Sequence, residues 1–148
     1  MIKFLRKGIV YEKMDFNLLI EGSIVFAGYR TDMIDRMETK QAHFDYIMEH
    51  EDPTSQAEAM DEFYNAWDDE LNRIYKLLMA KLSSAQKTKL RNEEREWLKQ
   101  RERKVNSETE GGTGMGVRIA YYSIMTGWTA DRAIELARRY DNLILNSI

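Results

Sequence analysis

The chain has 148 residues, 43% of them hydrophobic, which is enough for one domain with a buried core. Its 22 basic and 25 acidic residues leave a net charge of −3, so no basic excess is available to neutralise phosphates, and we expect no nucleic-acid partner. The absence of cysteine excludes disulfides, thiolate chemistry and cysteine-based metal sites.

The N-terminal region leaves two interpretations open, because residues 1–14 fit either a pair of short strands or an extended arm that lies against the rest of the protein. Residues 16–29 resemble a membrane element, but Glu21 interrupts them and they are shorter than the roughly 20 apolar residues that a span needs. The basic start followed by this run also resembles a secretory signal, which Lys13 and Asp15 break up. We therefore expect neither a membrane span nor a cleaved signal.

An apolar stripe at helical spacing follows Asp32, which we expect to cap this helix. The helix should end before Pro53, because proline disfavours helical backbone at the residue that precedes it. His43 and His50 lie seven residues apart here, whereas a metal site would need closer spacing or further ligands, so we expect no metal and no cofactor. The stripe consists of Met33, Ile34, Met37, Phe44, Ile47 and Met48.

Residues 55–103 predict two antiparallel helices joined by a short break, and the rest of the chain is organised around them. We expect each helix to start with a capping box, Ser55 with Glu58 and Ser83 with Gln86. The first helix has a broad apolar stripe of Met60, Phe63, Tyr64, Trp67, Leu71, Ile74, Tyr75, Leu78 and Leu82, and the second has a thin one of Leu90, Trp97 and Leu98. Accordingly, the two tryptophans should be neighbours in a dry seam between the helices.

Arginines near these stripes are expected to form semi-buried ion pairs and amide bonds that fix the register of the helices. The alternative is that they form a binding surface. The groups concerned are Arg95, Arg101 and Arg132 on one side and Asp68, Glu70 and Asn72 on the other.

Residues 106–116 contain four glycines in six positions, which predicts a flexible loop between two packed helices. Acidic side chains on flexible backbone could enter a cationic cleft of a partner, so Glu108, Glu110, Gly111 and Gly112 are our candidate partner-binding residues. The alternative is a connector that only reverses the chain.

The C-terminal region predicts two further helices. Residues 117–127 form an apolar segment that Gly127 should end, and Thr129 should cap the last helix. The buried face of that helix is Ala133, Leu136, Ala137, Tyr140 and Leu143. Taken together, the segments predict an all-α protein, an antiparallel bundle of four to five helices with a short N-terminal arm.

Three short motifs follow one another in residues 52–142. They are carried by Asp68, Leu71, Asn72 and Tyr75, then Arg95, Trp97 and Arg101, then Thr129 and Arg132, all of which we expect to be structural. Their order and spacing resemble the LprI-like lysozyme-inhibitor family of small bacterial helical proteins. The resemblance implies a family domain over residues 52–148, with an arm and an extra helix in residues 1–51.

The resemblance implies a binding protein rather than an enzyme, one that blocks a cell-wall hydrolase by occlusion, including as the immunity partner of a toxin. The alternative is a cytoplasmic interaction or scaffold module that keeps the fold without inhibitor activity and dimerises through its apolar arm. Family members usually lie outside the cytoplasm, which implies the periplasm. The absence of cysteine and of a clear signal indicates the cytoplasm instead.

Overall fold

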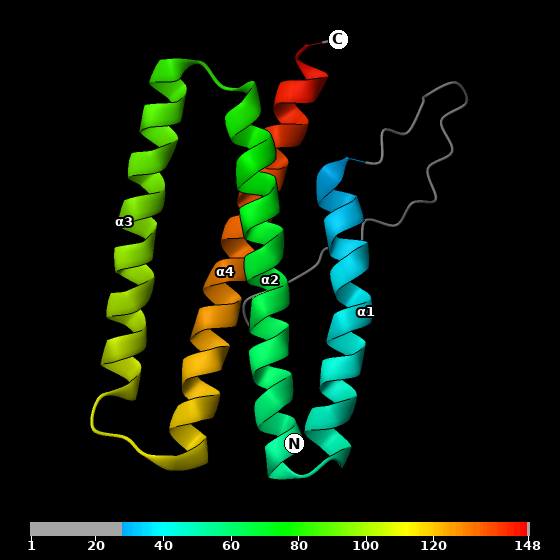
Figure 1. The fold of residues 1–148 in the computed structure, drawn as a ribbon, viewed down its shortest axis with the longest axis vertical. Coiled ribbons are helices and arrows are strands. Elements are labelled where there is room, and N and C mark those ends of the chain that lie inside the picture. Colours follow the sequence, from blue (N-terminus) through cyan, green and yellow to red (C-terminus); the bar gives the residue numbers. More distant parts are fainter. Residues whose placement is uncertain (1–27, 148) are drawn as a thin grey trace.

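The computed structural model describes residues 28–147. Within this range it contains four helices and no strand: α1 (Tyr29–His50), α2 (Pro53–Lys81), α3 (Ser84–Thr109) and α4 (Gly114–Leu145). The helices run alternately up and down, so the two turns at residues 51–52 and 110–113 lie at the same end of the bundle (Figure 1). The predicted all-α antiparallel bundle is confirmed, while the arm and the alternative strands of residues 1–14 lie outside the described residues.

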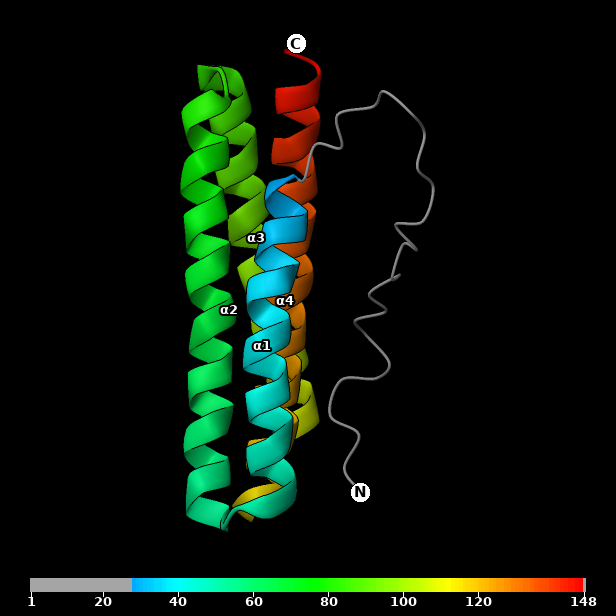
Figure 2. The same cartoon turned by 90° about the vertical axis from the view of Figure 1, so that its right-hand side faces the viewer.

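Helix α4 occupies the centre of the arrangement. It packs against α1, α2 and α3, and its interface with α2 is the most extensive of the three. Helices α2 and α3 are consecutive in the chain but share no extended interface, because α3 stands apart from α2 along most of its length (Figures 1 and 2). The only extended interface of the outer helix α3 within residues 28–147 is therefore the one with α4.

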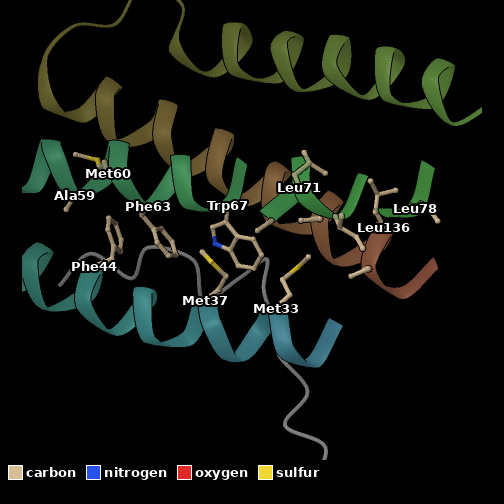
Figure 3. Packing of buried hydrophobic residues seen from close by; sticks show 14 of the residues in the cluster. Met33, Met37, Phe44, Ala59, Met60, Phe63, Trp67, Leu71, Leu78 and Leu136 are labelled. Carbon is tan, nitrogen blue, oxygen red and sulfur yellow. The ribbon is translucent and has the colours of Figure 1, made fainter. Parts of the chain in front are cut away.

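The core confirms the apolar stripes predicted for α1, α2 and the end of α4. The Trp67 indole has no exposed surface and points toward Met33 and Met37 of α1 (Figure 3). Burying side chains of this kind contributes roughly 1.5–3 kcal/mol each, which makes this three-helix contact the main source of stability. The core also contains Phe44, Met60, Phe63, Leu71, Ile74, Leu78, Leu90, Ala133, Leu136 and Ala137.

The predicted tryptophan seam between α2 and α3 is wrong. Trp67 packs toward α1, whereas Trp97 is only half-buried at the edge of the core. Helix α3 buries just Leu90 and Val105, so its apolar face is too narrow for a broad interface with α2. The more apolar α4 packs against both of them instead.

The start of α1 differs from the prediction that Asp32 caps it. The helix begins at Tyr29, and Asp32 lies exposed in the first turn. The cap comes from another helix, because the Asp141 carboxylate of α4 accepts hydrogen bonds from the backbone N–H of Tyr29 at 2.8 Å and of Arg30 at 3.0 Å. A Cβ atom on Gly28 would lie 2.5 Å from Oδ2 of Asp141, so the close approach requires glycine there.

The break at Pro53 is confirmed, but the capping box at the start of α2 is wrong. Asp52 is the N-cap, and its side chain accepts from the backbone N–H of Thr54 at 2.8 Å and of Ser55 at 3.2 Å. These hydrogen bonds, with a further one from the Ser55 hydroxyl, hold the pKa of Asp52 below its usual value. Since proline is well suited to the first helical position, Asp52 takes the role predicted for Ser55.

Helix α3 starts as predicted and ends later than predicted. Ser83 and Gln86 form the capping box through both of its hydrogen bonds. At the other end the helix continues to Thr109, where the predicted loop had already begun. An ion pair between Lys104 and Glu108, one turn apart, stabilises this last part of the helix.

Helix α4 is one continuous helix, so the predicted break at Gly127 is wrong, as is the cap at Thr129. Both residues lie inside the helix, which begins at Gly114. A glycine inside a helix costs about 1 kcal/mol, and packing against three neighbours outweighs that cost. Although α4 is long, no helix among residues 28–147 has the length and hydrophobicity that crossing a membrane requires.

Candidate functional site

Arg101 lies at the centre of a polar and aromatic cluster between α2, α3 and α4. Its guanidinium stacks 4.8 Å from the centre of the Trp97 ring and donates a hydrogen bond of 2.8 Å to the Thr129 hydroxyl. The Thr129 hydroxyl in turn donates to the carbonyl of Met125 at 2.6 Å. Two motif residues of α3 and one of α4 therefore meet at one point, where they join the two helices.

Tyrosines extend this cluster toward the surface. Tyr64 of α2 lies close to Arg101, and burial raises the pKa of its hydroxyl while the arginine works against that rise. Tyr122 of α4 donates a hydrogen bond of 2.9 Å to Asp61 of α2, and its ring meets that of Tyr64 edge-on at 6.4 Å. These contacts tie α2 to α4, which is a structural role, as expected for the motif residues nearby.

Arg132 is the centre of an ion-pair network between α3 and α4. Its side chain is 8% exposed and donates to Glu94 at 2.8 Å and to Glu135 at 2.6 Å. Arg139 joins the network by donating to Glu93 at 2.6 Å and to Glu135. The hydrogen bond from Arg139 lowers the pKa of Glu93 despite partial burial. Burial opposes the charge of Glu135, but its two arginine partners still hold its pKa below the usual value.

Glu70, the buried carboxylate of α2, binds α1 instead of the predicted arginines. It is 5% exposed and accepts two hydrogen bonds of 2.9 Å from Arg36 of α1. The Tyr29 hydroxyl lies at 3.5 Å and Arg73 at 3.8 Å. The predicted pairing of the motif arginines with this part of α2 is therefore wrong, because Arg132 pairs with Glu94 and Glu135, and Arg101 bonds to Thr129.

The remaining motif residues occupy separate positions. Leu71 is buried in the core and Tyr75 is half-buried beside it. Asp68 accepts a hydrogen bond of 2.9 Å from the Asn72 side chain one turn later on the same helix. Arg95 is exposed on α3 and reaches only Asn92, at 3.5 Å. The structure thus does not bring the motif residues together into one site.

The predicted partner-binding loop is shorter than expected. Only residues 110–113 lie between α3 and α4, and Gly111 has a φ of +70°, a conformation that glycine adopts readily. Glu110 and Gly112 are exposed in this turn, whereas Glu108 lies in the last turn of α3 and pairs with Lys104. Binding through these residues is not tested by the structure and stays a prediction.

A stronger charge feature lies on the α1–α2 hairpin, and it was not singled out from the sequence. Residues 41–72 contain ten acidic residues and no lysine or arginine. We call the exposed acidic residues of this segment nearest the turn between α1 and α2 the acidic hairpin surface, and it comprises Asp45, Glu49, Glu51, Asp52, Glu58, Asp61 and Glu62. The sequence signal was the long gap without basic residues between Lys40 and Arg73.

The acidic hairpin surface also contains an exposed aromatic side chain. Tyr46 is 56% exposed, and its ring stacks on that of His50 at 4.6 Å with an interplanar angle of 20°. Tyrosine is common among the residues that dominate protein interfaces, since it offers a large contact area at low entropic cost. Both turns lie at this end of the bundle, so Glu110 adds a further negative charge there (Figure 1).

Comparison with known proteins identifies a family. The family model described as "Lysozyme inhibitor LprI" matches residues 48–136, which includes all of α2 and α3 and the larger part of α4. No curated protein and no solved structure matched the chain.

Proposed function

The chain belongs to the LprI lysozyme inhibitor family, and on that premise we propose that it inhibits a peptidoglycan hydrolase by binding over the substrate cleft of the enzyme. The family description supports a protein partner and an inhibitor rather than a catalyst. The mechanism, occlusion of the cleft, rests on charge and shape. It requires no reactive group on this chain.

The observation that carries the proposal is the acidic hairpin surface. An uninterrupted negative segment attracts a partner with a positive cleft and increases the rate of their encounter. Within α2, Glu58, Asp61 and Glu62 have helical spacing that places them on one side, so their charges act together on one partner surface. A basic rim around a glycan-binding cleft is the complement of this surface.

Rigidity of the acidic hairpin surface favours tight binding. Its side chains stand on two helices that the core holds in place through the stacked pair of Phe44 and Phe63, whose ring centres are 4.8 Å apart. A partner therefore meets a preformed surface, and little ordering entropy is lost on binding. Tyr46 would supply the apolar anchor, with the acidic groups around it.

An inhibition assay with matched variants tests this proposal. Purified protein is titrated into peptidoglycan-lysis assays with several muramidases, and we expect inhibition that weakens as salt rises. The variant Glu49→Gln/Glu58→Gln/Glu62→Gln should raise the inhibition constant about tenfold or more. The control Asp35→Asn/Glu38→Gln/Glu102→Gln removes the same charge from exposed positions outside the surface and should inhibit as the parent does.

Two results would count against the proposal. Unchanged lysis by every hydrolase at a large molar excess would contradict inhibition itself. Equal loss in both triple variants would contradict the assignment to the acidic hairpin surface, and the α3–α4 turn with Glu110 would then be the next candidate. An immunity role is the narrower version of the same proposal. It predicts that co-expression protects cells from one hydrolase toxin and not from unrelated ones.

A further inference from the structure

A cavity of about 300 Å³ opens between the end of α2, the start of α3 and the end of α4. Four leucines line it: Leu78 of α2, Leu82 directly after that helix, Leu90 of α3 and Leu143 of α4. Leu78 and Leu90 are buried, so they form the floor, while the other two are half-buried nearer the opening. The volume lies at the lower end of the range for small-molecule sites.

The packing of α3 keeps this cavity open. Helices α2 and α3 diverge from the turn at Ser83 and share no extended interface. Across the cavity wall, Glu93 of α3 is held to Arg139 of α4 at 2.6 Å, which fixes the spacing of these two helices. The faces of the leucines that line the cavity therefore lack the dispersion contacts that a filled core would provide. Aliphatic carbon in the cavity would restore those contacts.

The rim of the cavity carries one net positive charge. Lys89 and Arg139 stand against a single acid, Glu93, which Arg139 already binds. Lys89 is exposed and forms no salt bridge within residues 28–147, although it is close enough to Glu93 to help lower the pKa of that group. The free ammonium would favour an anionic group at the opening and disfavour a cation.

We propose that this cavity binds a medium-chain aliphatic carboxylate, with its chain along the four leucines and its carboxylate beside Lys89. The Asn142 side chain, also on the rim, can donate a further hydrogen bond to the carboxylate. The proposal concerns the opposite end of the bundle from the acidic hairpin surface and does not depend on hydrolase inhibition (Figure 1).

A titration of the full chain with sodium decanoate tests the site. Leucine methyl NMR should show saturable shifts at Leu78, Leu82, Leu90 and Leu143. Lys89→Glu changes an exposed residue and should raise the dissociation constant for decanoate about tenfold. Lys81→Glu reverses the same charge at an exposed residue outside the cavity and should leave the affinity unchanged.

Two further experiments examine the aliphatic tail and the carboxylate head group of the ligand separately. Decanol should bind more weakly than decanoate, and decyltrimethylammonium should bind more weakly than decanol. Leu143→Trp should fill the cavity and abolish the shifts of the other leucines, with circular dichroism checking that the helices persist. Absence of saturable shifts in the unsubstituted protein would overturn the proposed site. It would lose its carboxylate specificity if decanol bound equally well, or if Lys81→Glu weakened decanoate as much as Lys89→Glu.

Discussion

Helix α2 buries nine side chains, whereas α3, which is nearly as long, buries two. The first is held by apolar packing against α1 and α4, with Trp67 at the centre. The second is held to α4 by arginine–glutamate pairs and by the hydrogen bond from Arg101 to Thr129. The comparison indicates that one bundle contains a stable three-helix core and an outer helix whose attachment depends on charge.

The largest expected effect is the difference in lost stability between substitutions of the two tryptophans. Trp67→Ala should destabilise the whole bundle by about 3–5 kcal/mol, because it removes a fully buried indole from between α1 and α2. Trp97→Ala should cost clearly less, since that ring is half-buried. Urea unfolding followed by circular dichroism measures both. Equal losses of stability would show that α3 is as much a part of the core as α2.

The next effect tests how α3 is attached. Arg132→Met leaves Glu94 and Glu135 without their main partner in a largely buried position, which should cost about 3 kcal/mol. We expect hydrogen exchange to accelerate in α3 before α1 and α2. Arg95→Met removes an exposed arginine from α3 itself and should leave exchange unchanged. Uniform acceleration across all four helices would contradict an independently detachable α3.

A smaller effect concerns the anchor of α1 on α4. Asp141→Ala removes the acceptor for the N–H groups of Tyr29 and Arg30 and should cost about 1–2 kcal/mol. Gly28→Ala should cost a similar amount, because its Cβ would displace the same carboxylate. Thermal unfolding of the single and double variants measures this. If the two losses add fully, the positions do not act through one contact.

The smallest effect is a pH dependence of the contact between α3 and α4. The folded protein lowers the pKa of Glu93 and Glu135 from an ordinary value of about 4.5. Their contribution is therefore complete above that value and is lost as the pH falls through the lowered pKa. Fluorescence of Trp97, measured in a Trp67→Phe/Trp128→Phe background that retains its helical circular dichroism, should change below about pH 4.5 before the helical signal falls. In the further variant Arg139→Met the early change should diminish. Simultaneous loss of both signals would contradict the prediction.

Much of the fold could be predicted from periodicity. The apolar stripes of α1 and α2, the break at Pro53 and the Ser83–Gln86 box all follow from local spacing and local hydrogen bonds. The motif residues also indicated the family that the comparison confirms. The division of the chain at residue 51, the dimerisation of the arm and the role of the α3–α4 turn remain predictions.

Errors arose where a distant partner replaced a local one. Asp141 caps a helix that begins 112 positions earlier in the chain, which no local pattern indicates. Gly127 was expected to end a helix, but packing against three neighbours keeps α4 continuous through it. The acidic hairpin surface was missed for another reason, since it is defined by the absence of basic residues over a long segment and not by a motif.

The sequence by itself determined that this chain folds as helices, where α3 begins, and which stripe of each helix is apolar, because those properties depend on residues within one or two turns. Only the tertiary structure decided that α4 packs against all three other helices, which acid pairs with which arginine, and that four leucines line a cavity. These features depend on contacts between residues far apart in the sequence. The position of each helix is set by the apolar faces of all the helices together, and no single segment determines it.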